Sequence, residues 1–115
     1  MFKIIMFVKK RAEFGTDEFL ACWRAHTAKV LHHQAALGIR AYTKTLPEAA
    51  DTMRDTLPFA WDALGELWYD SREAFNQARA TAAGQAALAT LRADEATFVD
   101  LTQSVLWFGE EERVI

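Results

Sequence analysis

The hydrophobic positions of this chain change period along its length, from that of a strand to that of a helix and back. Residues 2–9 are rich in apolar side chains at both parities, which predicts a strand whose two faces are both covered. From residue 19 to residue 37, mostly apolar side chains recur at intervals of four and three, which predicts a helix that begins at about residue 17. Residues 39–46 then alternate as a half-exposed second strand.

The second half of the chain repeats this order after a polar segment, residues 47–58, that has a proline at each end. The further predicted elements are a strand at 59–69, a helix that starts after Ser71 and is interrupted at Gly84, its continuation at 85–95 and a strand at 102–108. The order βαββαβ predicts an α+β, ferredoxin-like fold. We expect a four-stranded antiparallel sheet with helices on one face, in a single domain of residues 1–115.

Polar residues and glycines mark the ends of these elements. Thr16 is the expected N-cap of the first helix, and Asp17 and Glu18 suit the positive end of its dipole. Gly38 is the expected C-terminal cap. Residues 47–58 predict an irregular excursion that can cover a site, with room for one or two helical turns at 48–54.

The predicted sheet carries large apolar residues on both faces, although helices can cover only one. On the first strand, for example, Ile4 and Met6 alternate with Ile5 and Phe7. An uncovered face of this kind is a larger apolar patch than soluble monomers usually expose, and its burial, at roughly 25 cal/mol per Å², favours association. The pattern therefore predicts a homodimer formed sheet to sheet.

Composition and charge exclude several classes of function. The formal net charge is only −3, and residues 9–11 form the single basic cluster, so nucleic acid is not an expected partner. No apolar run is long enough to span a membrane and the first residues lack the features of a signal peptide, so we expect a cytoplasmic protein without a membrane partner. Cys22 is the only cysteine, which excludes a disulfide within one chain and a metal cluster held by cysteines.

One ionisable side chain, His26, lies on the apolar stripe of the first predicted helix, three residues after Trp23 and one turn before Val30. Core histidines held by one hydrogen bond are common, so packing alone can explain its position. An imidazole also titrates near neutral pH, however, and can abstract a proton next to a carbonyl group without a metal or cofactor. The pattern therefore makes His26 the candidate acid/base.

The partner of this histidine is open at the level of sequence. Asp62, Glu66 and Tyr42 are candidates, because each lies on a predicted strand and carries a group that can orient an imidazole or polarise a carbonyl. The neighbouring His32 and His33 point about 100° apart on a helix and lack the spacing of a helical metal site. We therefore expect no metal centre.

Several short sequence elements occur together over nearly the whole chain. They are the strand at 2–9, Glu18-Phe19, Trp23-Arg24 with a nearby histidine, Gly65-Glu66-Leu67-Trp68 followed by Asp70-Ser71, the segment 84–88, the segment 98–100 and a glutamate-rich end with Val114. Together they resemble the EthD family, which belongs to the dimeric α+β barrel superfamily. In that family the helix-one histidine often follows the tryptophan by four residues, whereas here the interval is three.

The resemblance implies an apolar pocket between the helices and the sheet of each protomer, which takes an aromatic, polyketide-like or other hydrophobic small molecule. His26 is then the expected catalytic residue, and no cofactor is expected. The expected ligand contacts are Phe19, Trp23, Val30, Trp61 and Phe75, although filling a core is the commoner role of such side chains.

Two classes of function follow from the resemblance. One is a cofactor-independent enzyme of the oxidoreductase or cyclase/lyase type, since the superfamily contains polyketide cyclases and cofactor-independent monooxygenases. The other is a non-catalytic accessory or carrier protein for a hydrophobic metabolite. A heme-handling role, also found in the superfamily, is a third. The sequence has no glycine-rich phosphate loop, nucleophile elbow or dinucleotide fingerprint.

Overall fold

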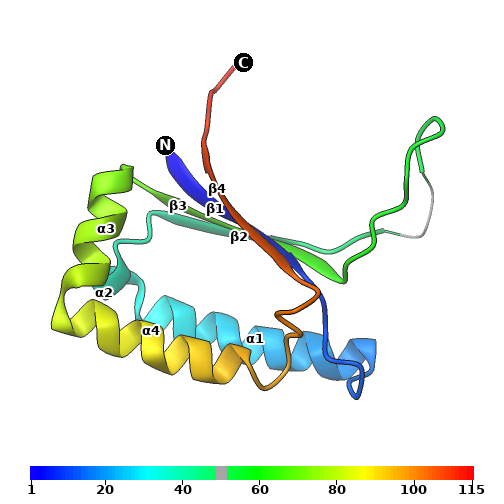
Figure 1. Ribbon diagram of the computed structural model, residues 1–115, viewed down its shortest axis with the longest axis horizontal. Helices are drawn as coiled ribbons and strands as arrows, with labels where there is room; N and C mark the ends of the chain where they lie inside the picture. Colours follow the sequence, from blue (N-terminus) through cyan, green and yellow to red (C-terminus); the bar gives the residue numbers. More distant parts are fainter. Residues whose placement is uncertain (49–51) are drawn as a thin grey trace.

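The computed structural model describes residues 1–48 and 52–115. In chain order the elements are β1 (Phe2–Val8), α1 (Thr16–His32), α2 (Gln34–Leu37), β2 (Ala41–Thr45), β3 (Ala63–Tyr69), α3 (Arg72–Ala80), α4 (Ala82–Glu95) and β4 (Val105–Glu110). The strands pair antiparallel in the order β2-β3-β1-β4, and the helices lie on one side of the sheet (Figure 1). This arrangement confirms the predicted ferredoxin-like α+β fold.

The inner strand β1, which pairs with β3 and β4, shows the two faces of the sheet. Ile4 pairs with Leu67 of β3 and with Phe108 of β4, and its side chain joins the core beneath the helices. Ile5 pairs with Glu66 and Trp107 on the opposite face. Because successive side chains of a strand point to opposite sides, parity decides whether a residue meets the helices or lies on the open face.

The first helix begins one residue earlier than the sequence predicts. The N-cap is Gly15, and the side chain of Glu18 accepts a hydrogen bond from the backbone N–H of Gly15 (3.2 Å). An acidic residue at this third position can therefore cap the helix without a hydroxyl at the N-cap. α1 ends at His32, α2 follows after His33, and Gly38 ends α2 in the left-handed region (φ 67°), as its cap role predicts.

The second helical region breaks at Thr81 and not at Gly84. The Thr81 hydroxyl accepts a hydrogen bond from the backbone N–H of Gly84 (2.9 Å), which starts α4, just as Ser71 starts α3. Gly84 has a different role, because a Cβ atom there would overlap the backbone carbonyl of Ala78 at the end of α3. The glycine therefore permits the close approach of the two helices.

Three strands begin later than the sequence predicts: β2 starts at Ala41, and β3 and β4 start later by a larger margin. β4 starts at Val105, because the Asp100 carboxylate accepts hydrogen bonds from the backbone N–H of Thr102 (3.0 Å) and from the side chain of Gln103 (2.7 Å), which closes a turn over these residues. β3 starts at Ala63, so residues 59–62 precede the strand.

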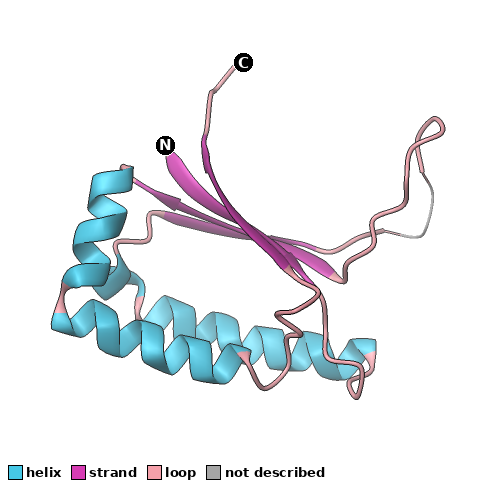
Figure 2. Cartoon of the chain, viewed as in Figure 1, coloured by secondary structure: helices cyan, strands magenta, loops and turns pink. Residues whose placement is uncertain are grey.

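The segment between β2 and β3 has no helix in its described residues, and it projects away from the helix layer (Figure 2). The helical turns predicted at 48–54 fall in part on residues 49–51, which lie outside the described residues. Residues 52–60 are exposed. Their position does not place them over the space between the helices and the sheet of the same chain.

The face of the sheet opposite the helices stays open in the described part of the chain. Its side chains are largely apolar and come from β1, β3 and β4. The outward residues include Ile5, Phe7, Leu64, Trp68, Val105 and Trp107. We call this surface, defined by these six residues, the open sheet face. Trp107 keeps 46% of its surface exposed and Val105 keeps 39%.

Candidate functional site

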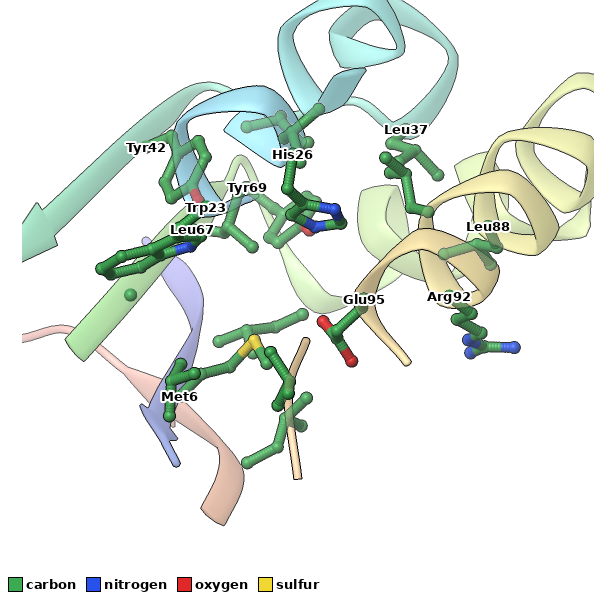
Figure 3. A pocket seen from close by; sticks show the side chains of 18 of the residues that line it. Met6, Trp23, His26, Leu37, Tyr42, Leu67, Tyr69, Leu88, Arg92 and Glu95 are labelled. Carbon is green, nitrogen blue, oxygen red and sulfur yellow. The ribbon is translucent and has the colours of Figure 1, made fainter. Parts of the chain in front are cut away.

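A cavity of about 240 Å³ lies between the helices and the inner face of the sheet. Its floor comes from inward-facing strand residues such as Ile4, Met6 and Leu67, and its walls come from α1 and α4 (Figure 3). Most of these side chains are apolar. A concave, mainly apolar space with a few polar groups is the usual form of a small-molecule site.

His26 is the one buried polar side chain among the described residues, with 7% of its surface exposed. It shares the buried stripe of α1 with Phe19, Trp23 and Val30, which recur at intervals of four, three and four. The helical period therefore turns the imidazole towards the cavity, which it lines (Figure 3).

Asp94, at the end of α4, holds the imidazole in place. Its Oδ2 lies 2.8 Å from Nδ1 of His26, and its Oδ1 accepts a hydrogen bond from Lys29 (2.6 Å). Burial raises the pKa of Asp94, but the hydrogen bonds from Lys29 and His26 outweigh it and hold that pKa below its ordinary value. An ionised Asp94 accepts from Nδ1–H, which leaves the lone pair of the neutral ring on Nε2.

The Nε2 atom of His26 has no hydrogen-bond partner within residues 1–48 and 52–115. Because it is not sealed from solvent and its ring lines the cavity, it is available to a ligand. His26 and Asp94 are arranged like a general base and the carboxylate that orients it, in which the carboxylate fixes the tautomer and stabilises the protonated ring. This arrangement can take a proton from a bound molecule and return it.

Further polar groups line the same cavity. Burial raises the pKa of Glu95, with His26 and Arg92 only partly offsetting it, and burial also raises the pKa of Tyr42. In both groups the shift is towards the neutral form. Arg79 of α3 lies with its guanidinium 4.1 Å from the ring centre of Phe75 and also lines the cavity.

Four of the six residues predicted for the site line the cavity: Trp23, His26, Val30 and Phe75. Phe19 does not line it; its side chain is fully buried and packs against Phe98, with ring centres 5.9 Å apart. Trp61 also does not. It precedes β3, so strand parity does not extend to it, and it packs on the outward ring of Phe7, with ring centres 5.0 Å apart.

The candidate partners of His26 mostly lie elsewhere. Glu66 pairs with Lys3 on the face away from the helices (2.8 Å), and Asp62 accepts from the backbone N–H of Lys10 (2.8 Å). Tyr42 alone lines the cavity. Asp94, which the sequence analysis did not single out, is the partner. The sequence gives little sign of this contact, since Asp94 lies 68 residues from His26. The one indication is that Asp94 follows the buried Leu91 by three positions on α4, which places it near the buried side of that helix.

No group of three His, Cys, Asp or Glu side chains in the described residues could hold a metal ion. None of the described helices is both long and apolar enough to cross a membrane.

The chain matches a known protein domain in sequence and known structures in fold. The EthD domain model matches residues 11–102. No curated protein sequence matches the chain significantly. An EthD family protein from Bacillus halodurans has a TM-score of 0.65 at 21% identity, with 97% of this chain and 99% of that chain covered.

Two more distant structures share the fold. A protein from Bacteroides fragilis, described as dimeric and ferredoxin-like, has a TM-score of 0.60 at 15% identity, covering 96% of this chain and 95% of its own. SnoaB from Streptomyces nogalater, a cofactor-independent oxygenase, has a TM-score of 0.56 at 13% identity, covering 99% and 95%. At these identities the likeness is one of fold. The domain match, which extends over most of the sequence, shows that the chain belongs to the EthD family.

Proposed function

We propose that this EthD protein binds a hydrophobic, ring-containing small molecule in the cavity between its helices and sheet, and that His26 moves a proton on that molecule without a cofactor. The observation that carries the proposal is the His26–Asp94 pair at the wall of a mainly apolar cavity (2.8 Å). Apolar walls bind the rings, and the imidazole supplies a buried base.

The environment of His26 supports this role over simple packing. A packed core histidine needs one partner, and Nδ1 already has Asp94. Asp94 is itself held by Lys29, so its charge is fixed beside the ring. A base oriented by a carboxylate, with its second nitrogen facing an apolar cavity, suits proton transfer in cyclisation, dehydration or isomerisation. An oxygenase-type reaction on the same ligand class fits the likeness to SnoaB, which is described as cofactor-independent.

The proposal includes a homodimer formed through the open sheet face. Trp107, Val105 and Trp68 lie on this face without a covering element among the described residues. Burial of such a patch favours association. The protein of the same fold from Bacteroides fragilis is described as dimeric, which supports the same assembly here.

The test uses 2-tetralone, a two-ring ketone whose C1 protons are acidic, in deuterated buffer. Proton NMR follows the loss of the C1 signal with time, and ligand-detected NMR follows binding. We expect the wild-type protein to bind the ketone and to accelerate the exchange above the rate in buffer. His26→Ala is expected to keep binding and lose the acceleration by about 100-fold, the usual contribution of a general base.

His32→Ala is the matched control, because His32 is an exposed histidine at the end of the same helix and does not line the cavity. It should exchange 2-tetralone at the wild-type rate. Exchange that persists in His26→Ala contradicts the acid/base role. Wild-type binding without acceleration favours the carrier function, and no binding contradicts the proposed pocket itself.

A further inference from the structure

Glu95 is a second acid of the cavity that the proposed mechanism does not use. It is the last residue of α4, directly after the Asp94 that holds His26. Figure 3 shows its carboxyl group reaching into the cavity from α4, while His26 reaches into it from α1. Within the described residues, the carboxyl group has no hydrogen-bond or ion-pair partner of its own. Its oxygen atoms are therefore available to a ligand in the cavity.

The surroundings of Glu95 disfavour a negative charge. The neighbouring cavity residues Leu91, Phe98 and Val99 are buried and apolar. The residue also stands at the C-terminal end of α4, where the helix dipole is negative and repels a carboxylate. Both effects act in the same direction, and they favour the neutral acid.

The charged and titratable groups that face Glu95 only weaken this effect. His26 from α1 and Arg92 from α4 itself lower the pKa of Glu95, and Tyr42 of β2 interacts with it as well. Arg79 of α3 lines the same cavity with its guanidinium against Phe75. Burial outweighs these groups, and the pKa of Glu95 stays above its ordinary value.

Asp94 and Glu95 therefore differ although they are adjacent in the chain. Asp94 has Lys29 and His26 as hydrogen-bond partners and a lowered pKa, whereas the pKa of Glu95 is raised. Two neighbouring carboxyl groups whose pKa values are moved apart are a common pattern in sites that need one charged and one neutral acid.

We propose that Glu95 is a catalytic residue that donates a hydrogen bond, and then its proton, to a carbonyl oxygen of the ligand, while Nε2 of His26 takes a proton from the adjacent carbon. The ligand class is thus a hydrophobic ring compound with an enolisable carbonyl group. This inference rests on the proposed function and deepens it.

The step balances within the site. The bond between the α-carbon and its hydrogen breaks, and that proton goes to Nε2 of His26. The electron pair forms the carbon–carbon double bond of the enol, the π-bond of the carbonyl opens, and its oxygen takes the proton of Glu95. Imidazolium and carboxylate remain and are reset when the two protons return, at the same or at another carbon. No oxidant, metal or second reactant is needed.

The test compares 2-tetralone with tetralin, which has the same two rings and no oxygen. Ligand-detected NMR measures the affinity of both probes for wild type, Glu95→Leu and Glu95→Gln. We expect wild type to prefer the ketone by about tenfold, the effect of one hydrogen bond. Glu95→Leu should bind both probes about equally. Glu95→Gln should keep the preference, because an amide still donates, but it should lose about 100-fold in deuterium exchange, because an amide cannot give up its proton.

The outcomes separate this inference from the proposed function. A ketone preference that survives in Glu95→Leu, or full exchange in Glu95→Gln, overturns the role of Glu95 while the binding and the His26 result stand. A wild-type protein that binds neither probe contradicts the proposed function and this inference with it. A wild type that binds both probes equally overturns the assignment of a carbonyl ligand. Glu95→Gln has the shape of the native residue, and its melting curve shows whether it is folded.

Discussion

At the scale of single residues, the site depends on how Asp94 is held. Its carboxylate joins the imidazole of His26 to the ammonium group of Lys29, and these contacts outweigh the effect of burial on its pKa. Because the pKa of Asp94 is lowered on folding, its contribution to stability is present above its ordinary pKa of 3.8 and is lost as the pH falls through the lowered value.

Asp94→Asn should therefore destabilise the protein more at neutral pH than at strongly acid pH. We expect a loss of about 1–2 kcal/mol in the free energy of unfolding at about pH 7, since a charged hydrogen-bonded group is removed and Lys29 is half exposed. As the pH falls below the ordinary carboxyl value and folded Asp94 takes up a proton, the difference should shrink, so it should be smaller at about pH 2. Denaturant unfolding at the two pH values measures this, with the exposed Asp55→Asn as control. An equal loss at both pH values would contradict the ionised Asp94.

The sequence predicted part of this residue-scale picture. The stripe of α1 placed Trp23, His26 and Val30 correctly, because helical periodicity is a local property. The sequence could not identify Asp94 as the partner of His26, because a contact between residues 68 positions apart leaves no local pattern. The family resemblance implied that Trp61 contacts a ligand, but in the structure this residue precedes β3 and packs on Phe7 outside the cavity.

At the scale of elements, the junction of α3 and α4 positions the end of the helix that carries Asp94 and Glu95. Gly84 was expected to interrupt the helix, since glycine has a low helix propensity. In the structure it lies within α4, and the interruption is at Thr81. A sequence alone does not distinguish a glycine that breaks a helix from one that lets another backbone approach, because the difference lies in the neighbour, here the carbonyl of Ala78.

Gly84→Ala should destabilise the protein by roughly 1–3 kcal/mol, the cost of an overpacked contact, because the added methyl group overlaps backbone and not a movable side chain. Gly65→Ala is the matched control. There an added Cβ meets the Trp23 ring at an ordinary 3.7 Å, so little or no loss is expected. Chemical denaturation of both variants measures the effect. A Gly84→Ala variant as stable as wild type would show that the two helices do not approach as closely as described.

At the scale of the whole molecule, the sheet has two apolar faces and only one layer of helices (Figure 1). The sequence predicted this imbalance from apolar residues at both parities of the strands, and the structure confirms the arrangement of strands and helices behind it. The path of the segment between β2 and β3 was not predictable, because polar, proline-bounded segments have no periodic pattern that fixes their direction.

Trp107→Glu should weaken the proposed homodimer by roughly 30-fold or more, as expected for an interface aromatic residue replaced by a charge. Sedimentation at micromolar concentration should give twice the chain mass of 13.0 kDa for wild type and a monomer for the variant. Leu31→Glu is the control, because Leu31 is 56% exposed on α1, on the opposite side of the molecule. A wild-type monomer, or a dimer that Leu31→Glu disrupts and Trp107→Glu leaves intact, would contradict the sheet-to-sheet assembly.

Nitrogen NMR of protein labelled at histidine tests whether Nε2 of His26 faces a ligand in the cavity. At about pH 8.5, two units above the ordinary imidazole value, the ring nitrogens report which of them carries the proton. The account predicts that His26 carries it on Nδ1. It also predicts that added 2-naphthol, whose hydroxyl can donate to Nε2, shifts the Nε2 signal of His26 and leaves His32 and His33 unchanged. A proton on Nε2, or no shift at saturating 2-naphthol, would contradict it.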